Sequence, residues 1–130
     1  MKIQTAVLTE KGWEDIPESL RQRADTPWFK SVLAFDPARI APKIRMPVLL
    51  LHGEKDRQVL PYHAENLDAA FRKGTNRQIE RRMLPADNHL FIEAKTGEVE
   101  EYLTLKHEVD RTMLQALGDW LAARLQPTPR

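Results

Sequence analysis

One stretch of this sequence limits the fold more than any other, and it runs from Pro47 to Leu60. It begins as Pro-Val-Leu-Leu-Leu-His, an apolar run without a charged residue, and Gly53 then opens a charged turn that contains Asp56. A short, continuously apolar run is typical of a strand buried on both faces, as in parallel sheets covered by helices. Functional loops of open α/β sheets follow the carboxyl ends of such strands. The stretch therefore predicts an α/β fold in which Asp56 lies on a functional loop.

A second strand is predicted one helix farther along the chain. Pro61 is suited to the first position of that helix. Four apolar residues share one face of it: Ala64, Leu67, Ala70 and Phe71. Residues 78–84 are the next strand candidate, and their charged residues place this strand at or near a sheet edge. Because a helix separates them, strands 47–52 and 78–84 are expected to be parallel neighbours joined by a right-handed crossover.

The N-terminal 25 residues give the weakest pattern. Over residues 3–9, Ile, Thr and Val alternate with other residues, which predicts a strand or an arm. This segment would be an extra N-terminal strand beside the two parallel ones. A short helix is expected over residues 16–24, with Pro17 near its first turn.

Two further helices are expected. Thr26-Pro27 precedes an aromatic helix that is expected to stop at Asp36-Pro37, because the residue before a proline disfavours the helical conformation. The last helix is expected over about residues 107–125, where apolar residues recur three and four positions apart. The expected division of the chain is an arm with a short helix at 1–25, an α/β segment at 26–125 and a flexible tail at 126–130.

The composition excludes several classes of function. With 42% hydrophobic and 30% charged residues, the chain resembles an ordinary globular protein. No apolar run approaches the roughly 20 residues of a membrane-spanning helix, and the N-terminus lacks the apolar centre of a signal peptide, so a cytoplasmic location is expected. The net charge of +1 gives no strong field, so neither nucleic acid nor a membrane is expected as a partner. The chain has no cysteine, which excludes disulfides, thiol catalysis and thiolate metal sites.

Asp56 has a candidate partner in His89. The loop that contains His89 follows strand 78–84, and parallel neighbours release their loops at the same edge of a sheet. A carboxylate beside an imidazole fixes the tautomer of the ring and stabilises the imidazolium that forms when the ring takes up a proton. Such a pair needs a nucleophile, which in this arrangement is normally the serine of a Gly-x-Ser-x-Gly turn.

The residues at 47–59 and the Asn-His-Leu-Phe at 88–91 resemble the C-terminal third of serine hydrolases with the α/β-hydrolase fold. The resemblance is closest to the esterase and dipeptidyl-aminopeptidase-like branch, and it extends over roughly residues 26–125. It implies a partial α/β-hydrolase fold in which Asp56 is the acid of the catalytic triad and His89 is its base.

The resemblance also implies a pocket beside these two residues. Leu90 and Phe91 would pack beside the acyl pocket. His52, at the end of the first strand, is expected to lie at the same pocket as a structural hydrogen-bonding residue.

This sequence departs from the family at the nucleophile. It has two serines, Ser19 and Ser31, and neither has a glycine within two positions, so there is no nucleophile elbow. In this fold the serine precedes the acid and the histidine along the chain. Loss of a nucleophile typically costs on the order of 10⁶ in rate. The prediction is a C-terminal segment of a serine hydrolase that retains Asp56 and His89 and is inactive alone.

Several alternatives stay open. The chain could be an active hydrolase completed by a serine from another chain, or a small-molecule or protein-binding module that reuses the pocket. Asp56 could be only a turn-forming residue, and Asp87 could replace it as the partner of His89. A metal site could use His52, Asp56, His63 and His89, which are suitable ligand types. Their spacing, however, matches no metal-binding motif. No metal and no cofactor are expected.

A sheet that starts at strand 47–52 would expose one of its edges. Such an edge is liable to aggregate unless a further strand pairs with it. The sequence therefore predicts self-association, either as a homodimer with edges paired across a two-fold axis or through residues 2–9 as an added strand. A separate N-terminal hydrolase chain that carries the serine is the other expected partner.

Overall fold

The computed structural model describes residues 2–125, so the predicted tail at 126–130 lies outside the described residues. The chain forms two compact units, residues 1–37 (unit 1) and residues 38–130 (unit 2), each described by itself. None of the described helices is both long enough and apolar enough to span a membrane.

Unit 1 is built from helices. It contains α1 (Lys2–Thr9), the 3₁₀ turn η1 (Trp13–Asp15), α2 (Glu18–Ala24) and α3 (Pro27–Ala34). The predicted strand or arm over residues 2–9 is wrong, because this segment is helical. Ala6 and Val7 are buried, and α1 packs against both α2 and α3. Ile3 lies three positions before Ala6 and four before Val7, so all three residues lie on one face of a helix. The same spacing had suggested an alternating strand.

The aromatic helix of unit 1 begins where its sequence predicts. The side chain of Thr26 accepts a hydrogen bond from the backbone N–H of Phe29 at 3.1 Å, and Pro27 occupies the first turn. This is the usual arrangement of a helix N-cap, in which a hydroxyl satisfies an N–H group that has no partner within the helix.

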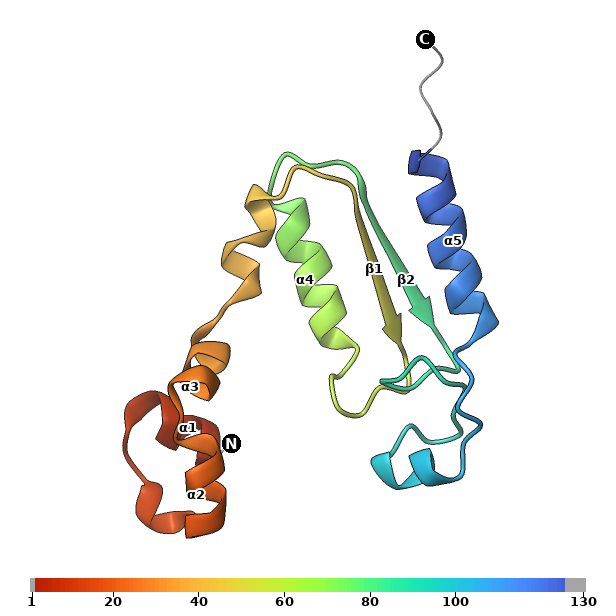
Figure 1. The fold of residues 1–130 in the computed structure, drawn as a ribbon. Coiled ribbons are helices and arrows are strands. Elements are labelled where there is room, and N and C mark those ends of the chain that lie inside the picture. The colour runs from red at the N-terminus through yellow and green to blue at the C-terminus, as the bar shows by residue number, and fades with distance from the viewer. Residues whose placement is uncertain (1, 126–130) are drawn as a thin grey trace. The chain divides into compact units, whose positions relative to one another are not determined.

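Unit 2 contains the two parallel strands that the sequence predicts. The strands are β1 (Val48–Gly53) and β2 (Ile79–Leu84), paired from Val48 with Ile79 to Gly53 with Leu84. Helix α4 (Tyr62–Arg72) connects them, and α5 (Arg111–Leu125) follows (Figure 1). The short 3₁₀ turns are η2 (Pro37–Arg39), at the boundary of the units, η3 (Ala41–Lys43) and η4 (Val99–Leu103).

Helices α4 and α5 both contact the two strands, and they lie on opposite sides of the sheet (Figure 1). On the α4 side, Phe71 and Ala70 form a buried cluster with Ala41 of η3, against which half-buried side chains of the strands pack. The strand residues in this cluster are Val48, Leu50 and Ile79. The sheet is thus covered on both faces, as the apolar run in β1 predicts.

The last helix starts later than predicted, at Arg111 instead of about residue 107. Asp110 explains the start, because its Oδ2 accepts a hydrogen bond from the N–H of Met113 at 3.2 Å and thereby caps the helix. The N–H of Asp110 in turn donates to the carbonyl oxygen of Phe91 at 2.8 Å. The residues before α5 are therefore tied to the loop that follows β2.

Candidate active site

Asp56 lies on the turn that directly follows β1. Its Oδ1 accepts hydrogen bonds from the backbone N–H groups of Gln58 at 2.9 Å and Val59 at 2.8 Å. An aspartate that bonds to the backbone two and three residues ahead stabilises a tight turn. The same bonds leave the second oxygen, Oδ2, available to a side chain from another loop.

Asp56 is almost completely buried, with 4% of the residue exposed. Burial raises the pKa of its carboxyl group, but hydrogen bonds from Val59, His89 and Gln58 outweigh that effect and hold the pKa below its ordinary value. The carboxylate is consequently charged at neutral pH and presents a fixed negative charge to its neighbour.

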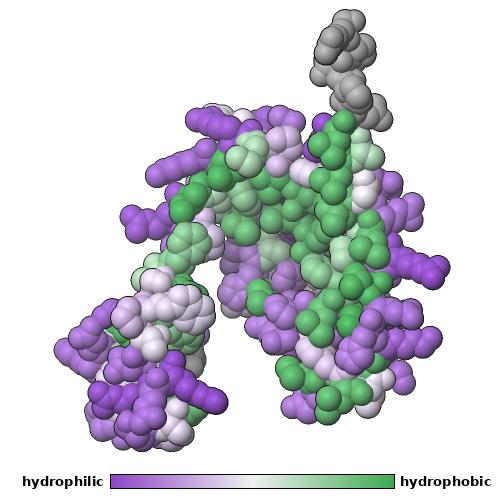
Figure 2. Space-filling view, viewed as in Figure 1, coloured by the Kyte–Doolittle hydropathy of each residue, from purple (hydrophilic) through white to green (hydrophobic). Residues whose placement is uncertain are grey.

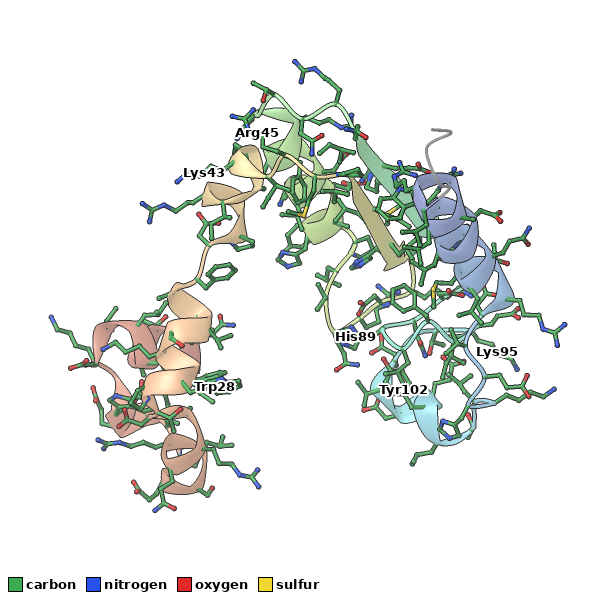
Figure 3. The ribbon with its side chains drawn as sticks, turned by 45° about the horizontal axis from the view of Figure 1, so that its top comes forward. Trp28, Lys43, Arg45, His89, Lys95 and Tyr102 are labelled. Atoms are coloured by element: carbon green, nitrogen blue, oxygen red, sulfur yellow. The ribbon has the colours of Figure 1, made fainter. Side chains whose placement is uncertain are left out.

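His89 lies on the loop after β2, beyond the carboxyl ends of the strands (Figure 3). Its Nδ1 is 2.9 Å from Oδ2 of Asp56. Because an ionised carboxylate can only accept a hydrogen bond, Nδ1 carries the proton of the neutral ring and Nε2 presents a lone pair. No hydrogen-bond partner of Nε2 occurs among residues 2–125, and 40% of the side chain is exposed. The nitrogen that would act as a base is therefore open.

Asn88 holds the turn that carries His89, a role that was not predicted from the sequence. Its side-chain oxygen accepts hydrogen bonds from the N–H groups of Leu90 at 2.9 Å and Ile92 at 3.2 Å, and the residue is fully buried. Within this turn Phe91 has a φ of 53°, a left-handed conformation that costs about 1 kcal/mol or more for a non-glycine residue. The two hydrogen bonds that the Asn88 side chain accepts, together with the backbone bonds of Asn88 to Ile92 and Phe91, hold the backbone in this shape.

The two loops are joined directly to each other. The N–H of Lys55 donates to the carbonyl oxygen of Asp87 at 2.9 Å, and the N–H of Glu54 donates to that of Leu84 at 2.9 Å. A Cβ atom at Gly53 would overlap with the carbonyl oxygens of Asp87 and Asn88, so only glycine permits this approach. The distance between Asp56 and His89 is therefore set by backbone contacts.

A third segment, residues 95–101, packs against the Asp56 loop. Gly97, with a φ of 81°, lies so close to Lys55 that a Cβ would overlap with the Lys55 carbonyl oxygen. The carboxylate of Glu101 accepts hydrogen bonds from Thr96 and from the N–H groups of Lys95, Thr96 and Gly97, which lowers its pKa to about 2. This carboxylate acts as a structural cap for the segment.

Asp87 is a buried acid beside the pair, with 1% of its surface exposed. Neither of its carboxylate oxygens has a hydrogen-bond partner in the described chain. Burial and repulsion from Asp110 and Glu93 raise its pKa to about 6. Asp87 thus does not take the place of Asp56 as the partner of His89, and its environment favours the neutral form.

His52, one of the other residues predicted for the pocket, lies near Asp56. The Nε2 of His52 lies 2.9 Å from the carbonyl oxygen of Val59 and 3.8 Å from Oδ2 of Asp56. Leu90 is 43% exposed and Phe91 is half-buried, both within the His89 turn. His63 lies instead on α4, with its ring against that of Tyr62. Over residues 2–125, no group of three or more His, Asp or Glu residues is arranged to hold a metal ion.

Neither serine belongs to the part of the chain that holds this pair. Ser19 lies in α2, and Ser31 lies in α3, where its hydroxyl donates to the carbonyl oxygen of Trp28 at 2.7 Å. The sequence of unit 2 contains no serine at all.

Comparisons with known proteins add one match. The model of the prolyl oligopeptidase family matches residues 1–113, which includes both loops and the whole crossover between the strands. Neither the curated proteins nor the solved structures gave a significant match.

Proposed function

Because the chain belongs to the prolyl oligopeptidase family of the α/β-hydrolase superfamily, we propose that Asp56 and His89 are the acid and the base of a serine hydrolase. The observation that supports this proposal best is the 2.9 Å contact between Oδ2 of Asp56 and Nδ1 of His89. Oδ1 of Asp56 is held at the same time by two backbone N–H groups. In this proposal unit 2 is the C-terminal part of an α/β-hydrolase domain. His52, Leu90 and Phe91 line the pocket beside the pair.

The proposed chemistry uses the two nitrogen atoms of the His89 imidazole ring. Nε2 takes the proton of an attacking hydroxyl group, and the ring becomes an imidazolium whose charge the buried carboxylate of Asp56 stabilises. The same nitrogen then returns the proton to the leaving group. Asp56 keeps its charge throughout, since its lowered pKa favours the ionised form.

The nucleophile is the missing component, and we propose that unit 2 does not hydrolyse esters or peptides alone. An acid–base pair without its nucleophile loses about 10⁶ in rate, since the three groups act as a unit. The purified chain should accordingly not react with a fluorophosphonate probe. Labelling of the purified chain would contradict this part of the proposal.

The roles of the pair can be tested without a nucleophile. In ¹⁵N-labelled protein, the neutral ring of His89 should carry its proton on Nδ1, and Asp56→Asn should abolish this preference. Asp119→Asn, which removes an exposed carboxylate from α5, is the matched control and should leave the tautomer unchanged. A wild-type ring protonated on Nε2 would refute the assignment of His89 as the base.

A second candidate function is a hydrolase completed by a serine of another chain. The observation in its favour is the open Nε2 of His89, whose side chain is 40% exposed. Fluorophosphonate labelling that appears only when another chain is added, and that His89→Ala abolishes, would establish it. His63→Ala on α4 is the control for loss of a histidine. The third option, a binding module that reuses the pocket, predicts ligand binding at Asp56 and His89 without turnover.

A further inference from the structure

His52 is a polar side chain at the end of an apolar strand. The residues before it in β1, from Val48 to Leu51, are all apolar, and in Figure 2 hydrophobic atoms lie over the sheet of unit 2. Only 13% of the His52 side chain is exposed. A polar group so far removed from water is expected to have a hydrogen-bond partner, because leaving it unpaired costs free energy. The partner of His52 therefore indicates what this side chain does.

That partner is the carbonyl oxygen of Val59, seven residues farther along the chain. Nε2 of His52 lies 2.9 Å from this oxygen. Because a carbonyl oxygen can only accept a hydrogen bond, Nε2 carries a proton and donates it. Nε2 of His52 also lies 3.8 Å from Oδ2 of Asp56. It has no lone pair to offer, however, so His52 does not compete with His89 as a base at this nitrogen.

Val59 connects His52 to Asp56. Its N–H group donates to Oδ1 of Asp56 at 2.8 Å, while its carbonyl oxygen accepts the hydrogen bond from His52. Burial raises the pKa of Asp56, and the hydrogen bond from Val59 is the largest of the effects that lower it. Residues 57–60 are exposed and contain no helix or strand. The placement of this exposed turn thus determines how the Asp56 carboxylate is held.

We propose that His52 is a positioning residue, which holds Val59 in place so that Asp56 keeps its Oδ2 directed at His89. The inference rests on the proposed function, in which Asp56 and His89 are the acid and the base. His52 is suited to this role because its strand is fixed by pairing with β2, where Met83 lies opposite it. Without the bond from His52, Val59 can move, and the N–H group that orients the Asp56 carboxylate moves with it.

The tautomers of the two histidines give the first test. In ¹⁵N spectra of the full chain, the neutral ring of His52 should carry its proton on Nε2, whereas that of His89 should carry it on Nδ1. A His52 ring protonated on Nδ1 would overturn the inference, because its Nε2 would then have no proton to donate to Val59. A His89 ring protonated on Nε2 would instead refute the proposed function, so the two failures are distinguishable.

Substitutions of His52 test the position of the donor. His52→Gln keeps an N–H group at about the reach of Nε2, His52→Asn keeps the same amide on a side chain too short to reach Val59, and His52→Leu removes the donor. Amide hydrogen exchange of Val59 should be about fivefold faster in His52→Leu and His52→Asn, as expected for the loss of one hydrogen bond. His52→Gln should restore the wild-type rate. His63→Leu, on α4, is the control for loss of a histidine and should leave the rate unchanged.

The same variants are then compared at His89. His52→Leu and His52→Asn should lower the ratio of Nδ1-protonated to Nε2-protonated neutral ring about fivefold, and His52→Gln should retain it. A general loss of stability would not shift the tautomer within folded molecules. A wild-type ratio in His52→Leu would contradict the positioning role, as would equal Val59 exchange rates in His52→Gln and His52→Asn. The comparison of these two amide variants decides the question if His52→Leu does not fold.

Discussion

Asp87→Asn should stabilise this protein at neutral pH and leave its stability in acid unchanged. Asp87 is 1% exposed, both of its carboxylate oxygens lack hydrogen-bond partners among the described residues, and Asp110 and Glu93 repel its charge. Asparagine has the same shape without the charge. The substitution therefore removes a cost that the folded chain bears only when Asp87 is ionised.

The magnitude follows from the pKa. Burial, then repulsion from Asp110 and Glu93, raises the pKa of Asp87 from 3.8 to about 6. This difference corresponds to about 3 kcal/mol. Because the pKa in the folded state is the higher one, the stability that the neutral side chain contributes is complete below about pH 4 and is lost as the pH rises through about 6. The free-energy gain from Asp87→Asn should thus grow from near zero at about pH 4 to about 3 kcal/mol at about pH 7.

Urea unfolding at the two pH values measures this gain. Replacing Trp13 and Trp28 by phenylalanine in all variants leaves Trp120 of α5 as the fluorescent reporter of unit 2. Asp119→Asn is the matched control, since an exposed carboxylate should change stability by no more than about 0.5 kcal/mol at either pH. A gain from Asp87→Asn that is the same at both pH values, or no gain at neutral pH, would refute the reasoning.

Other substitutions have equally defined outcomes. Gly53→Ala should destabilise unit 2 by about 1–3 kcal/mol because its Cβ would overlap with the Asp87 carbonyl, whereas Gly118→Ala, in open space on α5, should stabilise it by about 0.5–1 kcal/mol; urea unfolding compares the two. Asn88→Ala should cost about 1–3 kcal/mol and also loosen the His89 tautomer in ¹⁵N spectra, a change that simple destabilisation would not produce. Thr26→Ala should lower the thermal stability of unit 1 by about 1 kcal/mol, and circular dichroism melting with Thr26→Ser as control measures it.

The strands of unit 2 and the positions of its two functional loops could be predicted from local sequence patterns. The apolar run in β1 and the helix after Pro61 are sufficient to predict two parallel strands, and parallel strands bring the Asp56 and His89 loops to one edge. Helix α1 was missed for the opposite reason. Its short segment fits both a strand and a helix, and the burial of Ala6 against neighbouring helices decides between them. That contact cannot be read from the spacing of residues 3–9.

The roles of Asn88 and Asp87, which support the site, could also not be predicted from the sequence. Asn88 and Asp87 are short polar residues in a turn, a position where such residues are normally exposed. Their burial arises because residues 92–94 and Asp110 fold back over the loop. A polar pair directly before a histidine is a weak signal, and only the closed turn reveals that Asn88 orders the backbone.

The hydrogen bonds at Asp56 also lead us to expect that the two loops of the candidate site form at different stages of folding. The Asp56 carboxylate is fixed by amides only two and three residues away, so its geometry costs little loop-closure entropy and can form as soon as the turn does. We expect His89 to reach its place later, because its contact with Asp56 closes 33 residues of chain that include α4 and β2. Asp56 is thus held by local contacts and His89 by long-range ones. Mutations in α4 should therefore slow the placement of His89 without disturbing the Asp56 carboxylate.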